Sequence, residues 1–171
     1  MVKKIIITGG LGYIGTELCK IYSGVSWHHK VVVIDNRFIS ERVNQIRNWN
    51  MEFVHGDILN KELVNKVFKD ADVVHHLAGI TDVPRTKNEA TDEKNNKIKL
   101  VGEKGTENVL NAISKDCKII FPSTHVVYEG IDEVRVDIKE DEDTKPILSY
   151  SSSKAANEKQ LKESGKNYII L

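Results

Sequence analysis

Short apolar runs rich in β-branched residues alternate with longer amphipathic stretches along the chain. The apolar runs predict strands, and several are apolar at successive positions, as in a sheet covered on both faces. These runs are KKIIIT (3–8), KVVVID (30–35), MEFVHGD (51–57), DVVHHLAG (72–79), KIIFPST (118–124) and NYIIL (167–171). The stretches between them have helical spacing and predict helices over 13–23, 40–49, 60–70, 97–114 and 149–164.

This alternation predicts a doubly wound α/β fold with a parallel sheet and right-handed crossovers. We expect the strand order 3-2-1-4-5-6. The last helix should close on Gly165 in a left-handed conformation. The chain of 171 residues has the length of one ordinary domain and shows no linker or internal repeat, so we expect one domain over 1–171.

The segment TGGLGYIG joins the first predicted strand to the first predicted helix, the context that a dinucleotide-binding loop requires. Gly9 would allow the tight turn, Gly12 would let the backbone approach a pyrophosphate, and Gly15 would let the helix pack close to the strand. Tyr13 and Ile14 open the predicted helix, whose free N–H groups and dipole favour an anion. The alternative is a glycine-rich turn without a ligand.

Two aspartates stand at the ends of the next two predicted strands. Asp35, followed by Asn36, can accept hydrogen bonds from both ribose hydroxyls and would repel a 2′-phosphate, which favours NAD over NADP. Arg37 weakens that preference, because a guanidinium can partner a phosphate. Asp57 can accept a hydrogen bond from the adenine amino group while Ile58 packs on the ring, or it can be a simple loop or capping aspartate.

The motif SYSSSK places Tyr150 and Lys154 on one face of a predicted helix. An ammonium beside a phenol lowers the phenol pKa from its usual value near 10, so the pair could take a proton from a substrate hydroxyl. The spacing is common by itself. It gains weight from FPSTHVVY, whose Ser123 and Thr124 hydroxyls could hold a substrate oxygen as it gains carbonyl character. His125 is a weaker candidate for a general base than for a packed or substrate-edge residue.

Two charged, turn-rich stretches, 81–97 and 129–149, follow the ends of predicted strands. Ligands bind at the carboxyl edge of an open α/β sheet, so both stretches are candidate active-site loops. The alternative for each is a solvated surface loop.

Composition narrows the range of partners and compartments. Lys plus Arg and Asp plus Glu number 25 each, and no basic stripe interleaves with aromatics, which argues against nucleic acid or a membrane and favours a small-molecule partner. Cys19 and Cys117 lie far apart and outside metal or redox spacing, so we expect two buried thiols in a reducing compartment. The start of the chain predicts a strand rather than a signal peptide, and no stretch approaches membrane-spanning length. We therefore expect a cytoplasmic chain with no metal site.

Taken together, TGGLGYIG, VVVIDN, HGDI, HHLAG, STHVVY, YSSSK and KGTENVLNA resemble the extended short-chain dehydrogenase/reductase family in order along the chain. Within it they are most similar to the NAD-dependent nucleotide-sugar epimerase/dehydratase group. The resemblance implies a Rossmann fold that binds NAD, and it supports the roles given above to the glycine loop and the two aspartates. It also implies that Leu77, Ala78 and Gly79 pass under the cofactor.

The same resemblance implies catalytic roles. Thr124 matches the catalytic serine or threonine, Tyr150 the catalytic tyrosine, and Lys154 the lysine that also binds the nicotinamide ribose. In such enzymes the tyrosinate removes a proton from a sugar hydroxyl while hydride passes from the same carbon to NAD, leaving a transient ketose. An epimerase then returns hydride to the other face.

Three departures from the family pattern matter. THV stands where the dehydratases carry an acidic pair, TDE, which disfavours dehydration. Gly102 stands where an asparagine commonly precedes GT, which would loosen a contact near the active site. The family continues after YIIL with an arginine and asparagine motif and a smaller lobe that binds the nucleotide sugar, whereas this sequence stops at Leu171. We therefore expect that lobe to be largely absent, with NAD binding retained and turnover weak or lost.

Rival functions stay open at this point. The first is a nucleotide-sugar epimerase represented by its cofactor-binding part, with a dehydratase or reductase of the same family beside it. The second is an NAD-binding sensor or scaffold without turnover, and the third is an inert fragment. The intact set of Thr124, Tyr150 and Lys154 favours an enzyme. The resemblance also implies a homodimer through the helices of GTENVL and YSSSK, with which the small Ala155 and Ala156 are compatible.

Overall fold

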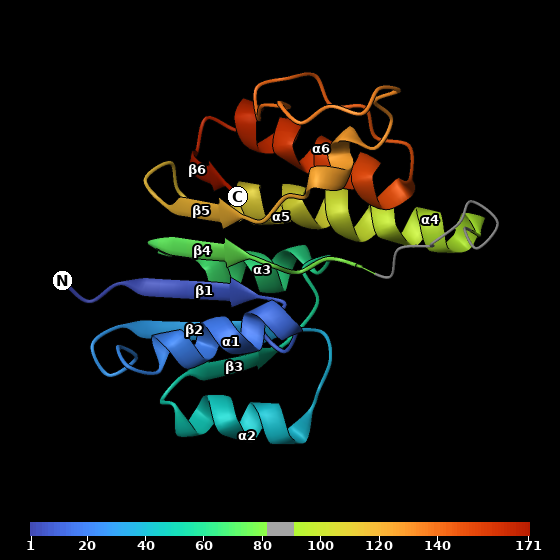
Figure 1. Ribbon diagram of the computed structural model, residues 1–171. Helices are drawn as coiled ribbons and strands as arrows, with labels where there is room; N and C mark the ends of the chain where they lie inside the picture. The colour runs from blue at the N-terminus through green and yellow to red at the C-terminus, as the bar shows by residue number, and fades with distance from the viewer. Residues whose placement is uncertain (82–90) are drawn as a thin grey trace.

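The computed structural model describes residues 1–81 and 91–171, which form a parallel sheet of six strands with helices on both faces (Figure 1). In chain order the elements are β1 (Lys4–Thr8), α1 (Tyr13–Tyr22), β2 (Lys30–Asp35), α2 (Ser40–Asn48), β3 (Glu52–His55), α3 (Lys61–Phe68), β4 (Val73–His76), α4 (Asp92–Lys99), η2 (Leu100–Lys104), α5 (Gly105–Ala112), β5 (Lys118–Phe121), η3 (His125–Tyr128), α6 (Ser149–Glu163) and β6 (Asn167–Ile170). The predicted α/β class is confirmed. None of the helices in the described ranges is long and apolar enough to cross a membrane.

The strand order is β3-β2-β1-β4-β5-β6, and every pairing is parallel, which confirms the predicted order. In β1 at the centre, Ile6 packs with α3, α5 and α6, while Ile5 and Ile7 pack with α1 and α2. The alternation of a strand thus divides the core into two layers. The connection that follows β1 crosses one face of the sheet, and the connection that follows β4 crosses the other face. In sheets of this kind, such a reversal opens a crevice at the carboxyl edge.

The two edge strands are less buried than expected for a sheet that is covered on both faces. β3 and β6 contain no fully buried residue, and Tyr168 and Ile169 of β6 are 39% and 38% exposed. An edge strand pairs on one side only, so an apolar run there is buried less than the same run at the centre.

The predicted helix over 97–114 is longer in the structure and changes its winding. It begins at Asp92, with the Thr91 side chain as its N-cap, and passes through a π-helical turn, η2. The turn-rich stretch predicted over 81–97 is therefore helical from Asp92, while its residues 82–90 lie outside the described part of the chain. The helix start was missed because only Ile98 of α4 is buried, so the apolar spacing is weak.

Gly102 lies in η2, where it packs closely against α6. A Cβ atom at this position would lie 2.1 Å from Oγ of Ser153 on α6, and the Gly102 carbonyl accepts a hydrogen bond from Nδ2 of Asn157 at 3.1 Å. The glycine therefore brings η2 against α6, the helix that carries SYSSSK, rather than loosening that contact.

The first turn of α6 is held by a carboxylate from the preceding loop. Oε1 of Glu129 accepts hydrogen bonds from the N–H groups of Ile147 and Leu148, at 2.8 and 2.7 Å, and from the Ser151 hydroxyl. Desolvation works to raise the pKa of Glu129, but these three hydrogen bonds outweigh it and leave the pKa lowered. Glu129 therefore fixes the start of the helix that presents Tyr150.

Glu129→Ala should lower the free energy of unfolding at pH 7 by about 1 kcal/mol, the usual value of a helix cap, and Glu129→Gln by less. Because the folded-state pKa is lowered, this stabilisation is present above the unfolded pKa and is lost as pH falls through the folded value. Urea unfolding at pH 7 and below pH 4 measures both effects. Glu133→Ala, at an exposed position of the same loop, is the control. A Glu129 variant as stable as this control at pH 7 would contradict the cap.

Gly15→Ala should lower the free energy of unfolding by about 1–3 kcal/mol, because the new Cβ would lie 2.5 Å from the Gly9 carbonyl oxygen and 2.6 Å from Cα of Gly10. Both of these atoms belong to the backbone, which cannot move aside as the end of a flexible side chain can. Gly24→Ala is the matched control, since its nearest neighbour would be 3.9 Å away. Thermal unfolding of the two variants measures the difference. Equal melting temperatures would contradict the close packing at Gly15.

Candidate functional site

The glycine loop turns directly from β1 into α1 at the carboxyl edge of the sheet. Gly9 has a φ of +64° and donates its N–H to the carbonyl of Ile34 at 2.8 Å, which fastens the turn to β2. Gly12 is the N-cap residue of α1, where it supplies no side-chain hydrogen bond. Tyr13 and Ile14 are 86% and 61% exposed. The start of α1 is therefore uncapped and open to solvent, with its positive dipole end available to an anion.

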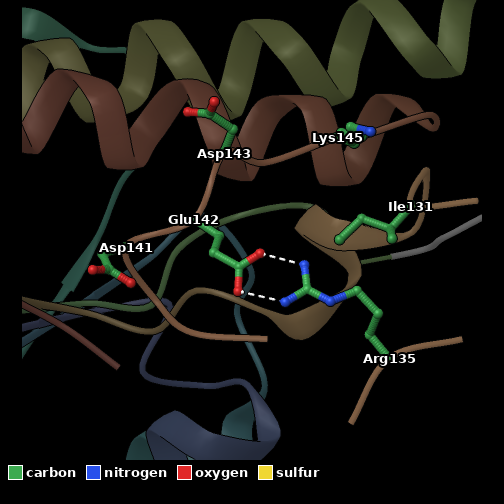
Figure 2. A pocket seen from close by; sticks show the side chains of 6 residues that line it. All are labelled: Ile131, Arg135, Asp141, Glu142, Asp143 and Lys145. Carbon is green, nitrogen blue, oxygen red and sulfur yellow. Dashed lines mark hydrogen bonds and ion pairs between the residues drawn. The ribbon is translucent and has the colours of Figure 1, made fainter. Parts of the chain in front are cut away.

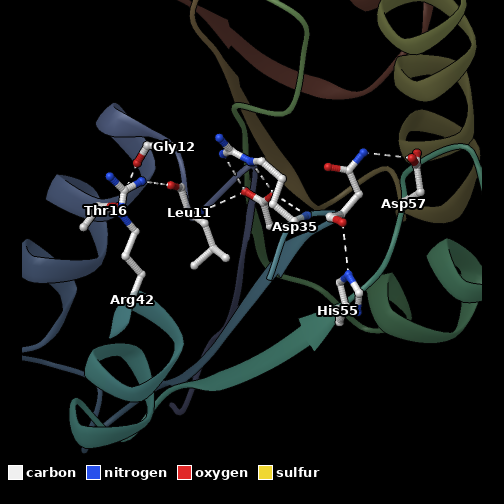
Figure 3. A network of polar contacts seen from close by, with 9 residues as sticks. Leu11, Gly12, Thr16, Asp35, Arg42, His55 and Asp57 are labelled. Carbon is white, nitrogen blue, oxygen red and sulfur yellow. Dashed lines mark hydrogen bonds and ion pairs between the residues drawn. The ribbon is translucent and has the colours of Figure 1, made fainter. Parts of the chain in front are cut away.

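Asp35, only 5% exposed, stands at the end of β2 beside this loop (Figure 3). Its Oδ2 accepts the Leu11 N–H at 3.0 Å, and its Oδ1 accepts the Arg37 N–H at 3.0 Å. The guanidinium of Arg37 donates two further hydrogen bonds to this carboxylate, from Nε to Oδ1 at 3.1 Å and from Nη2 to Oδ2 at 3.2 Å. Hydrogen bonding to Asp35 raises the pKa of Arg37. The carboxylate lies where the ribose role predicts, but Arg37 covers it.

Asn36 connects the ends of β2 and β3. Its Nδ2 donates to Oδ2 of Asp57 at 2.9 Å, and its carbonyl is 3.0 Å from Nε2 of His55. Asp57 also accepts the Leu59 N–H at 2.9 Å, the loop-capping contact considered as the alternative reading. Ile58 is 4% exposed and packs into the core, with its Cδ1 2.4 Å from where a Cβ of Gly105 would stand. The adenine roles of Asp57 and Ile58 stay predictions.

A buried histidine supports the segment predicted to pass under the cofactor. His76 of β4 bonds Oγ1 of Thr8 at 2.9 Å and Oγ1 of Thr106 at 3.0 Å, and Thr8 in turn accepts the N–H of Ala78 at 2.9 Å. Burial, followed by the charge of Lys154, lowers the pKa of His76 to about 3. His76 is therefore a neutral link between β1, β4 and α5. This role was missed, because it depends on partners on β1 and α5 that lie far away along the chain.

After His76 the chain leaves β4 at the edge of the sheet through Leu77, Ala78 and Gly79. A Cβ on Gly9 would lie 2.9 Å from the backbone of Ala78, so the glycine loop and this segment run against each other. A Cβ on Gly79 would meet nothing within 4 Å. The segment therefore lies against the glycine loop and is exposed at Gly79, and its place under the cofactor stays a prediction.

Lys154 connects α6 to the end of β5. Its Nζ donates to the carbonyl of Pro122 at 2.7 Å and lies 4.3 Å from the ring centre of Phe121 and 5.9 Å from that of Tyr150. Burial lowers the pKa of Lys154 to about 8. Burial also raises the pKa of Tyr150, so the expected lowering by the ammonium is not realised in this structure. The physical reason is that burial disfavours the charged phenolate.

The two candidate hydroxyls after β5 have different partners. The Ser123 hydroxyl donates to Glu158, while Oγ1 of Thr124 accepts only a long hydrogen bond, 3.4 Å, from the Val126 N–H at the start of η3. Thr124 is thus the better candidate to donate to a substrate oxygen. His125 is exposed.

The loop over 129–149 lines an open pocket of about 440 Å³ (Figure 2). Arg135 and Glu142 face each other across it with contacts of 2.6 and 3.1 Å. The residues that line this pocket are Ile131, Arg135, Asp141, Glu142, Asp143 and Lys145. All six residues lie in the stretch 129–149, and the role of this stretch as an active-site loop stays a prediction.

Known proteins share this arrangement. Residues 5–171 match the NAD dependent epimerase/dehydratase family. The chain is 30% identical over 174 residues to a dTDP-D-glucose 4,6-dehydratase of Dictyostelium discoideum, covering 92% of this chain and 39% of that protein. It is 30% identical over 169 residues to a UDP-glucose 4-epimerase of Azospirillum brasilense, covering 95% and 44%. The chain therefore spans less than half the length of these curated relatives.

Solved structures give the same result. One is a UDP-glucuronic acid 4-epimerase variant of Bacillus cereus in complex with a fluorinated UDP-sugar and NAD. It has a TM-score of 0.81 and 27% sequence identity, and the match covers 98% of this chain and 55% of that chain. The Bordetella bronchiseptica enzyme WbmH, in complex with NAD⁺, has a TM-score of 0.81 at 28% identity, with coverages of 100% and 55%. The chain belongs to the NAD dependent epimerase/dehydratase family, whose cofactor is NAD.

Proposed function

We propose that this chain is the cofactor-binding part of an NAD-dependent nucleotide-sugar epimerase in which Thr124, Tyr150 and Lys154 carry the proton chemistry. One observation supports this most: Lys154 is bonded to the end of β5, on the sheet edge that also holds the glycine loop. A sensor would need the cofactor loop but no buried lysine beside a tyrosine. UDP-sugar 4-epimerases among the relatives and solved structures are consistent with the same activity.

The residues of the fold match what NAD needs. The open start of α1 and the side-chain-free Gly12 suit a pyrophosphate, and Asp35 suits the adenosine ribose. Bound NAD would supply the acceptor for the two electrons and the hydrogen that leave the sugar carbon.

Tyr150 would take the proton of the sugar hydroxyl during oxidation and return it after the opposite face is reduced. Thr124 would donate a hydrogen bond to the same oxygen while it is a carbonyl. Because burial raises the pKa of Tyr150, the phenolate needs a nearby positive charge. Lys154 supplies that charge once its ammonium turns from the Pro122 carbonyl toward the phenol.

An epimerase is favoured over a dehydratase of the same family. Loss of water needs an acid and a base after the catalytic threonine, whereas here the exposed His125 and the apolar Val126 follow Thr124. The nucleotide-sugar substrate is proposed for a protein with a further substrate lobe. The homodimer through the helices of GTENVL and YSSSK, which are α5 and α6, stays a prediction.

Two substitutions test the proposal by separating cofactor binding from chemistry. Lys154→Met should weaken NADH binding about tenfold or more, because a charge-assisted hydrogen bond to the ribose is lost. Tyr150→Phe should leave NADH binding within about twofold and abolish any conversion of UDP-glucose to its C4 epimer. Nucleotide fluorescence measures binding, and NMR of the sugar measures conversion.

Lys159→Met, on the exposed face of the same helix, is the control and should bind NADH like the parent chain. Conversion retained by Tyr150→Phe would contradict the catalytic assignment. Unchanged NADH binding by Lys154→Met would contradict the place of the lysine beside the ribose.

A further inference from the structure

A largely buried carboxylate lies one helical turn after the candidate catalytic lysine. Glu158 stands on α6 four residues beyond Lys154, so both side chains leave the same face of the helix. The Glu158 side chain is only 12% exposed. An acidic side chain is rarely buried this far without partners, because removing a carboxylate from water costs free energy. The contacts of Glu158 therefore indicate what it does in this fold.

The partners of Glu158 lie on α6 and just after β5. Its Oε1 accepts a hydrogen bond from the Ser123 hydroxyl, and its Oε2 lies 3.4 Å from Nζ of Lys162. The Lys162 side chain is 53% exposed, so water screens this ion pair. Glu158 is therefore bonded to the sheet edge through Ser123 and is only weakly neutralised by Lys162.

Ser123 stands between two groups that the candidate site uses. The carbonyl of the preceding residue, Pro122, accepts the Lys154 ammonium at 2.7 Å, and the next residue, Thr124, carries the candidate catalytic hydroxyl. A carboxylate that holds Ser123 restrains the peptide on either side of it. Glu158 therefore helps to set the positions of both the Pro122 carbonyl and the Thr124 hydroxyl.

Lys154 needs a negative charge nearby if it is to remain an ammonium. Burial lowers the pKa of Lys154 to about 8, and the charge of Glu158 acts in the opposite direction. Burial also lowers the pKa of His76 to about 3 and raises that of Tyr150, so both are uncharged at pH 7. From β5 the ammonium meets the Phe121 ring, which carries no net charge. Of these described neighbours, Glu158 is the one that supplies a compensating charge.

We propose that Glu158 is a positioning residue that keeps Lys154 in its charged form. Through its bond to Ser123 it also fixes the segment on which Thr124 stands. The inference rests on the proposed function, in which the Lys154 ammonium acts on the Tyr150 phenol and on the cofactor ribose. Glu158 acts through the lysine rather than on the substrate.

NMR of the 171-residue chain labelled with ¹³C at the lysine Cε atoms tests this without cofactor or substrate, because the Cε shift follows the charge of each lysine. Lys154→Arg removes one signal and so assigns it. Glu158→Gln removes the charge but keeps an oxygen that can accept the Ser123 hydroxyl. In this variant Lys154 should titrate about one pH unit lower than in the parent chain. The pH at which NADH binding weakens should fall by the same amount.

Glu163→Gln is the matched control on the same helix. It removes the same charge from an exposed residue that lies 3.9 Å from Lys159, and it should leave the titration of Lys154 unchanged. Circular dichroism checks that each variant is folded. If Glu158→Gln does not fold, Lys162→Met decides. It removes the cation that competes for Glu158, so Lys154 should then titrate at a higher pH than in the parent chain.

The titration separates this proposal from the proposed function. A Lys154 signal that titrates as in the parent chain, in Glu158→Gln or in Lys162→Met where only the latter folds, would overturn the role of Glu158 and leave the proposed function standing. A shifted Lys154 titration in a chain that does not bind NADH would support the role of Glu158 and overturn the proposed function.

Discussion

The turn that follows β1 sets the positions of most of the groups at the candidate site. Gly15 lets α1 begin within van der Waals range of Gly9 and Gly10, and Gly9 takes a left-handed conformation so that the chain can reverse there. The same turn is bonded to β2 through the Ile34 carbonyl and lies against the backbone of Ala78 after β4. One glycine-rich turn thus joins the ends of three central strands, and the open start of α1 faces outward from that junction.

From this junction the site extends along the sheet edge through buried polar contacts. Thr8, His76 and Thr106 form a chain from β1 through β4 to α5, with the histidine kept neutral by burial. Lys154 stands beyond it, bonded to the Pro122 carbonyl above the Phe121 ring. The predicted ribose residue Asp35 thus ends β2, while Tyr150 and Lys154 lie on α6, and strands and helices position side chains more precisely than loops do.

The strand order and the glycine turn were predictable because they depend on local patterns. The apolar runs of β1, β2 and β4 and the spacing of Gly9, Gly12 and Gly15 are properties of short segments. The roles of Glu129 and His76 were not predictable, because each depends on a partner brought near only by folding. Glu129, for example, caps a helix that begins twenty residues later along the chain.

The electrostatics were also harder to predict than the geometry. A lysine four residues after a tyrosine correctly placed both on α6, but burial raises the pKa of Tyr150 and a backbone carbonyl holds the Lys154 ammonium. Likewise Asp35 ends β2 as expected, yet its oxygens are taken up by Arg37. Distance along a helix or strand determines which side chains can meet, whereas desolvation and competing donors determine their charge.

The most direct test of a single cofactor site at this edge is a map of backbone amide NMR shifts as NADH is added to the 171-residue chain. If the site is built as described, saturable shifts appear in the glycine loop from Gly9 to Gly15, at Asp35 to Arg37 after β2, and at Thr124 and Tyr150. Shifts that spare the glycine loop, or that fall only around the pocket lined by Arg135 and Glu142, would contradict it.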